Sequence, residues 1–102
     1  MADIVDIARA QRESLRWVIL LALWHARPYG TNESVLMRIA RDTALHITPD
    51  QIRQEMNYLK GRKYIDVQSN QPIWHAEILP EGEDLVDYRA DCPEGIARPA
   101  KW

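Results

Sequence analysis

The side chains best suited to catalysis are three histidines, one cysteine and a run of acidic residues toward the C-terminus. The histidines His25, His46 and His75 lie in three different predicted elements, and none has a partner at the spacing of metal ligands. Cys92 has no histidine near it in the sequence to activate its thiol. The sequence therefore predicts no metal site, no cofactor and no enzymatic activity.

The acidic run consists of Glu81, Glu83, Asp84 and Asp87. A calcium-binding loop alternates its oxygen ligands around a central glycine, and the run lacks this arrangement. We interpret these carboxylates as the solvated face of a helix.

A different chemistry is offered by residues 48–63, where polar and basic side chains recur at helical spacing. With Ile52, Met56 and Leu59 on the inner face of a helix, the intervening polar residues face outward. Asn and Gln can form two hydrogen bonds to adenine and Arg to guanine, while Lys and Arg bind phosphates. The predicted DNA-contacting residues are Arg53, Gln54, Asn57, Lys60, Arg62 and Lys63.

The overall charge argues against a nucleic-acid partner, because DNA-binding domains usually present a basic surface. The chain has 13 basic and 15 acidic residues, a net charge of −2. The charge is unevenly distributed, however: residues 48–63 carry a balance of +2 and residues 77–94 a balance of −6. The positive part of the sequence therefore coincides with the predicted DNA contacts.

Two features favour the alternative, an amphipathic helix whose polar side is merely solvated. Asp50 stands at the outward N-terminal end of this helix, where its charge repels phosphate. The hairpin tip predicted at residues 69–72 has no Lys or Arg to enter a minor groove. The sequence leaves both interpretations open.

The elements that position these side chains follow from hydrophobic spacing and capping residues. Residues 3–27 predict one long helix, because they contain neither Gly nor Pro and are followed by Pro28-Tyr29-Gly30. The remaining predicted elements are a second helix opened by Thr31-Asn32-Glu33, a third helix opened by Thr48-Pro49-Asp50 and ending near Gly61, strands at 64–67 and 73–79, and a short helix at 83–90.

This order of elements predicts a mainly α fold with a small β-hairpin, the winged helix-turn-helix. A winged-helix domain would cover residues 1–90, and residues 91–102, which lack periodicity, would form a C-terminal tail. A single cysteine suits a reducing compartment, and the longest apolar stretch, residues 17–24, is far shorter than the roughly 20 residues that span a bilayer. We therefore expect a cytoplasmic protein that does not bind a membrane.

The first helix carries two apolar stripes, whereas a surface helix needs only one. One of them consists of Trp17, Leu20, Leu21 and Trp24. Either the helix is buried at the centre of the domain or this stripe meets another subunit. Since a small domain can seldom surround a helix and Trp is enriched at interfaces, the sequence predicts a homodimer through these four residues.

The sequence resembles the small winged-helix proteins of unknown function that Mu-like phages and prophages encode. The similarity extends over residues 12–99 and rests on the segments 15–21, 28–34, 48–59 and 95–99. One departure is Leu79-Pro80-Glu81-Gly82, where many winged-helix proteins have Leu-Thr-x-x-Gly. The resemblance implies a winged-helix fold, a phage origin and a bacterial host, and it brings no catalytic residues.

Two functions are consistent with these observations. The first is a phage-encoded winged-helix protein that binds double-stranded DNA, as a transcriptional regulator does. The alternative is a protein-interaction module in phage assembly or DNA packaging that binds another phage protein, which the acidic C-terminal region and the uncharged hairpin tip favour.

Overall fold

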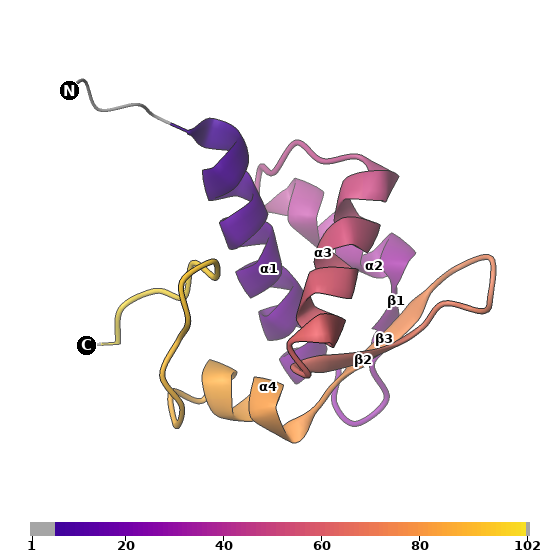
Figure 1. Cartoon of the computed structure of the whole chain (residues 1–102). Helices are drawn as coiled ribbons and strands as arrows, with labels where there is room; N and C mark the ends of the chain where they lie inside the picture. The colour runs from indigo at the N-terminus through magenta and orange to yellow at the C-terminus, as the bar shows by residue number, and fades with distance from the viewer. Residues whose placement is uncertain (1–5, 102) are drawn as a thin grey trace.

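The computed structural model describes residues 6–101, which form helices and strands in an order close to the predicted one (Figure 1). The elements are α1 (Ile7–His25), β1 (Thr31–Asn32), α2 (Glu33–Asp42), α3 (Pro49–Gly61), β2 (Ile65–Gln68), β3 (His75–Ile78) and α4 (Pro80–Val86). Residues 3–5 of the predicted first helix lie outside the described part of the chain. Within residues 6–101, no helix has the length and apolar character needed to cross a membrane.

The cap predicted for α3, Thr48, is confirmed, and α2, for which the sequence allows Thr31 or Asn32, is capped by Asn32. The Asn32 side chain accepts a hydrogen bond from a backbone N–H of the first turn of α2. At α3, Thr48 and Gln51 form a reciprocal pair: the Thr48 hydroxyl accepts from the Gln51 N–H at 3.2 Å, and the Gln51 side chain accepts from the Thr48 N–H at 2.8 Å. The start of α3 is therefore determined by local sequence.

The three strands form an antiparallel sheet in the order β1-β3-β2. The predicted hairpin is confirmed, with Ile65 opposite Ile78 and Gln68 opposite His75. Strand β1 adds one strand that the sequence did not predict, because two residues cannot display an alternating pattern. The described residues thus form a mixed α/β globule of four helices and a small three-stranded sheet.

Helix α4 begins three residues before its predicted start. Pro80 occupies its first turn, where the fixed φ of proline suits a helix, so Pro80 starts the helix as well as ending the strand. Gly82 then allows the helix to approach β2 closely, since a methyl group on Gly82 would overlap the carbonyl oxygen of Tyr64. The helix ends at Val86 rather than continuing to residue 90.

The core lies among the four helices and the sheet. The predicted inner face of α3 is confirmed, because Ile52, Met56 and Leu59 are at most 1% exposed. The other largest fully buried side chains come from all parts of the chain: Leu15, Ile19, Leu20, Leu23, Leu36, Ile65 and Leu85. Burial of these side chains is the main favourable contribution to folding.

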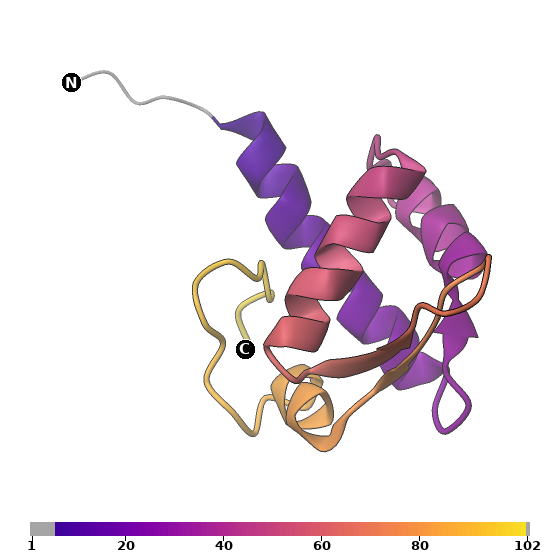
Figure 2. The same cartoon turned by 45° about the vertical axis from the view of Figure 1, so that its right-hand side comes forward.

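The segment after α4 returns along α1 (Figures 1 and 2). The Ala97 N–H donates to the Glu13 carbonyl oxygen at 3.1 Å, and the Arg16 guanidinium donates to the Gly95 carbonyl oxygen at 2.8 Å. Ile96 between these two contacts is buried. Part of the segment predicted as a tail therefore packs on the domain.

Candidate nucleic-acid interface

Helix α3 presents an exposed ridge that contains Gln54 and Asn57. The two residues are three positions apart, so they lie on the same side of the helix, opposite the buried Ile52 and Leu59. Asp50 is also exposed at the N-terminal end of α3. We call Asp50, Gln54 and Asn57 the α3 ridge; its amides can donate and accept hydrogen bonds at base edges.

Arg53, one of the predicted DNA contacts, has a guanidinium that is engaged within the chain. Its Nε and Nη2 donate to the two carboxylate oxygens of Glu33 at 2.7 and 2.6 Å, and Nη2 also donates to the Pro72 carbonyl oxygen at 2.9 Å. The guanidinium carbon lies 4.5 Å from the centroid of the Trp74 ring. Arg53 therefore joins α2, α3 and the hairpin instead of standing free at the surface.

The Glu33 carboxylate is the centre of this arrangement and is almost fully buried. The hydrogen bonds from Arg53 lower the pKa of Glu33 below its usual value; burial opposes this effect, and the Trp74 N–H, which donates at 2.9 Å, reinforces it. We call Glu33, Arg53 and Trp74 the hairpin clamp. Sequence reasoning missed it because 20 residues separate Glu33 from Arg53 and a further 21 separate Arg53 from Trp74.

The other three predicted basic contacts, Lys60, Arg62 and Lys63, are exposed at the C-terminal end of α3. None of them forms an ion pair with another residue of the described range 6–101. The Lys60 ammonium lies 3.5 Å from the Val67 carbonyl oxygen on β2, which places it on the hairpin side of the helix. These cations are therefore free to bind an anionic partner, and they also complement the negative end of the helix dipole.

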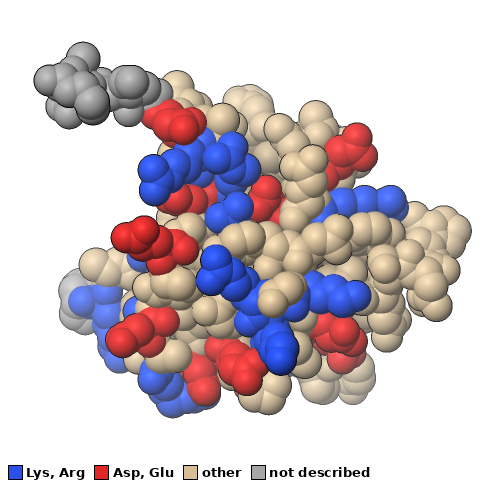
Figure 3. Space-filling model, viewed as in Figure 1, with Lys and Arg blue, Asp and Glu red and all other residues tan. Residues whose placement is uncertain are grey.

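A further group of basic residues, not predicted from the sequence, faces α3 from α1. Arg9, Arg12 and Arg16 line a shallow hollow of about 390 Å³ together with Arg62 and Tyr58. We call it the α1–α3 hollow. Figure 3 shows Lys and Arg side chains across this face of the molecule, with Asp and Glu among them. Spacings of three and four residues between the α1 arginines could have indicated a shared helical face.

A largely buried ion pair joins α1 to α3. The Arg16 Nε donates to Glu55 Oε1 at 2.6 Å, and both side chains are at most 14% exposed. The Arg16 guanidinium carbon also lies over the Tyr58 ring, 3.6 Å from its centroid. Glu55 falls within the apolar stripe of α3, and this carboxylate on an inner face was a sequence signal that a buried cation must meet it.

The four predicted dimer residues are covered to different extents by the chain itself. Leu20 is fully buried in the core, so it cannot contact a second subunit, and Leu21 is half-buried. Trp17 is half-buried and packs edge-on against Tyr88, with ring centroids 6.4 Å apart. The second apolar stripe of α1 therefore meets α4 and the C-terminal segment, which the sequence pattern of α1 alone cannot reveal.

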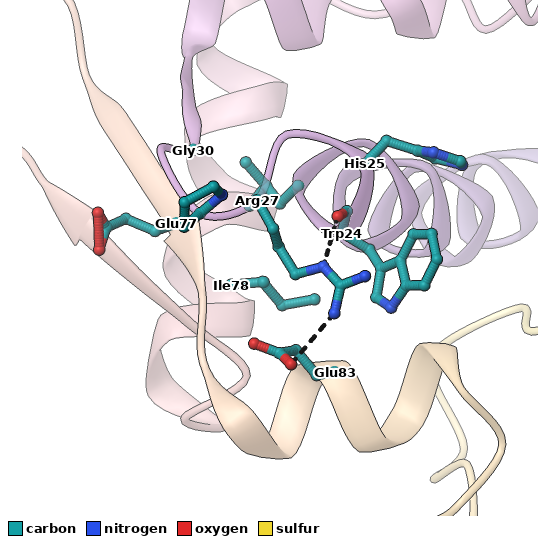
Figure 4. A pocket seen from close by; sticks show the side chains of 9 residues that line it. Trp24, His25, Arg27, Gly30, Glu77, Ile78 and Glu83 are labelled. Atoms are coloured by element: carbon teal, nitrogen blue, oxygen red, sulfur yellow. Dashed lines mark hydrogen bonds and ion pairs between the residues drawn. The ribbon is translucent and has the colours of Figure 1, made fainter.

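Trp24 lines a pocket of about 470 Å³ at the opposite end of α1 from the N-terminus (Figure 4). Arg27 lies over the indole at 4.0 Å, donates to the Trp24 carbonyl oxygen at 2.8 Å and pairs with Glu83 on α4 at 3.3 Å. In Figure 4 the side chains of His25 and Glu77 point away from this group. Within residues 6–101, the Trp24 indole N–H has no hydrogen-bond partner.

The residues considered for catalysis are dispersed. Across the described residues, no three His, Cys, Asp or Glu side chains gather as metal ligands. The His75 ring lies 3.0 Å from the Tyr29 carbonyl oxygen, and the Cys92 thiol is half-buried, 3.4 Å from the Ile96 carbonyl oxygen. Both side chains therefore contact backbone carbonyl oxygens of the chain itself.

Comparison with known proteins adds no family to this description. No protein-family model, curated protein or solved structure matches the chain.

Proposed function

We propose that this chain is a winged-helix protein that binds double-stranded DNA by inserting α3 into the major groove. The order α1, β1, α2, α3 and then a hairpin supports the winged-helix assignment. The observation that carries the functional proposal is the α3 ridge with its exposed Gln54 and Asn57. Lys60, Arg62 and Lys63 lie at the C-terminal end of the helix and form no ion pair with any residue from 6 to 101. Amides for base edges and cations for phosphates are the two components of such an interface.

The dimensions and rigidity of α3 support this role. Thirteen residues make a helix about 20 Å long, which fits the major groove, about 12 Å wide. The helix is held at its start by the Thr48 capping box, on one side by the hairpin clamp and on the other by the Arg16–Glu55 pair. A helix held in this way loses little conformational freedom when it binds, and this favours affinity.

The resemblance to winged-helix proteins of Mu-like phages supports a phage origin, action in the cytoplasm of a bacterial host and a role as a transcriptional regulator. Asp50 at the N-terminal end of the ridge repels phosphate, so the contacts would concentrate on the C-terminal half of α3.

The test is fluorescence-anisotropy binding of the purified protein to labelled random-sequence duplex at about 50 and 200 mM salt, the range in which phosphate contacts are most evident. We expect micromolar binding at the lower salt that falls steeply at the higher. The variant Lys60→Gln should weaken binding at every sequence, whereas Arg89→Gln, which removes an exposed charge beside α4, should not. Absence of wild-type binding at 50 mM salt contradicts the proposal.

A second candidate, a protein-docking module in phage assembly or packaging, is favoured by exposed apolar side chains away from α3. Tyr29 is 81% exposed and Ile73 is 50% exposed, and the hairpin tip between β2 and β3 has no Lys or Arg. Binding to a purified phage structural protein that is lost in Tyr29→Ser and Ile73→Ser but retained in Lys60→Gln would favour this candidate over DNA binding.

A further inference from the structure

Two of the four arginines that line the α1–α3 hollow have no ion-pair partner within residues 6–101. Arg9 is paired with Glu13 at 3.0 Å, and Arg16 is paired with Glu55. Arg12 and Arg62 are both exposed, and neither forms an ion pair within residues 6–101. Two guanidinium groups therefore face the same hollow with no carboxylate bound to them.

The hollow continues along the side of α3. A smaller cavity of about 120 Å³ lies between the same two helices, and Arg12 lines both. The smaller cavity is lined on the α3 side by Gln51 and Gln54, and on the α1 side by Gln11. The lining of the resulting groove includes amides and arginines, together with the Glu55 carboxylate, which is paired with Arg16. Gln54 belongs both to this groove and to the α3 ridge.

We propose that this groove, centred on Arg12 and Arg62, binds the phosphates of one DNA backbone strand while the α3 ridge faces the bases. The inference rests on the proposed function and adds to it the side of contact. The DNA backbone lies on the α1 side of α3 and is not bound by the hairpin. Guanidinium groups suit phosphate because their planar N–H donors match two phosphate oxygens at once.

On the hairpin side of α3, the predicted contact Arg53 is already engaged, and this favours the α1 side for the backbone strand. There the Arg53 guanidinium is neutralised by Glu33, and the hairpin tip, residues 69–72, supplies no cation. Lys60 lies on that side too, with its ammonium 3.5 Å from the Val67 carbonyl oxygen. The α1 side offers a phosphate the guanidinium groups of Arg12 and Arg62, whereas the Arg53 guanidinium on the hairpin side is already bound to Glu33.

The Tyr58 ring and two carboxylates surround the arginines of the groove in the unbound protein. The Tyr58 ring lies under Arg16 at 3.6 Å and beside Arg62 at 5.1 Å, so it keeps the two guanidinium groups apart and oriented. Glu94 on the C-terminal segment also lines the hollow and offsets part of its positive charge, as does Glu13. A phosphate would therefore bind nearest Arg12 and Arg62 and away from these carboxylates.

The experiment measures the salt dependence of duplex binding for the wild type, Arg12→Gln, Arg12→Lys and Arg89→Gln, at several salt concentrations between about 50 and 200 mM. Loss of one phosphate contact should lower the magnitude of the slope of log affinity against log salt by about 0.9. We expect this change in Arg12→Gln, little change in Arg12→Lys, and none in Arg89→Gln, which makes the same change of charge outside the groove. Circular dichroism melting shows whether each variant is folded. We expect Arg12→Gln to fold, because Arg12 is exposed on α1 and Gln is a good helix former.

The outcomes separate this inference from the function on which it rests. Wild-type binding with an unchanged slope in Arg12→Gln overturns the groove and leaves DNA binding intact. Absence of wild-type binding overturns both. Binding of a soluble phosphate compound is tested by titrating ¹⁵N-arginine-labelled protein with pyrophosphate at constant ionic strength. If the Arg12 and Arg62 Nε–H signals shift in a protein that does not bind duplex, the groove binds a soluble phosphate compound. That result would overturn the DNA assignment.

Discussion

Arg16 and Glu55 lie 39 residues apart in the sequence and form a hydrogen-bonded ion pair of 2.6 Å between α1 and α3. Because both side chains are largely buried, water compensates either charge poorly if the other is removed. The same arginine stacks on Tyr58 and donates to the Gly95 carbonyl oxygen, so it links α1, α3 and the C-terminal segment. This pair thus joins the elements that line the α1–α3 hollow.

Removing one member of this pair should be much more destabilising than replacing both. We expect Glu55→Leu to lower the free energy of unfolding by about 3 kcal/mol, since Arg16 is left buried without a counter-charge. In the double variant Arg16→Met/Glu55→Leu most of this loss should be recovered. Urea denaturation of the wild type, both single variants and the double variant measures the coupling. Additive losses in the double variant would show that the pair is not coupled.

The hairpin clamp should make stability depend on pH in the acidic range. The folded-state pKa of Glu33 lies below its unfolded value of about 4.5, so the ionised form stabilises the fold above that pH. This contribution is lost as the pH falls through the lower, folded-state pKa. Urea midpoints measured at pH 7, 4.5 and 3 should therefore approach one another for the wild type and Glu33→Gln as the pH falls.

The exposed residue Glu81 provides the control for this measurement. Glu81→Gln makes the same chemical change on α4 without touching the clamp, and its difference from the wild type should not follow that of Glu33→Gln. A difference between wild type and Glu33→Gln that stays constant from pH 7 to pH 3 is incompatible with the proposed role of the Glu33 charge.

Two glycine-to-alanine substitutions should have opposite effects. Gly61 is exposed in the last turn of α3, and a methyl group there meets no atom within 4 Å, so Gly61→Ala should stabilise by about 0.5–1 kcal/mol. Gly30 has a φ of +71°, and its methyl group would overlap the Ala76 carbonyl oxygen, so Gly30→Ala should destabilise by about 1–2 kcal/mol or more. Thermal melting of both variants beside the wild type checks the two signs, and a neutral Gly30→Ala would contradict the turn geometry.

The full chain should be a monomer in solution. The α1 stripe predicted to pair two subunits is covered by α4 and the C-terminal segment, which leaves Trp17 half-buried against Tyr88. Light scattering at tens of micromolar should therefore give a mass near 11.9 kDa. Removal of residues 88–102, which include Tyr88, should expose the stripe and raise the measured mass or cause aggregation. A dimer mass for the full chain would contradict this prediction and favour the interface predicted from the sequence.

The parts of the fold that local chemistry decides could be predicted from the sequence. Thr48-Pro49-Asp50-Gln51 determines the start of α3 because each cap contact spans three residues or fewer, and Ile52, Met56 and Leu59 identify its inner face by spacing alone. The same periodicity places Gln54 and Asn57 at the surface. The start of α4 was missed because Pro80 can end a strand and open a helix equally well.

The tertiary structure alone decided which charged side chains are free. Arg53 and Lys60 look alike in the sequence, yet Arg53 meets Glu33 from another helix whereas Lys60 remains without an ion-pair partner in the described chain. In the same way, Leu20 looks like an interface residue until the C-terminal segment and α4 are seen to enclose α1. Capping and periodicity act over one helical turn, whereas ion pairing and burial depend on residues that only the folded chain brings together.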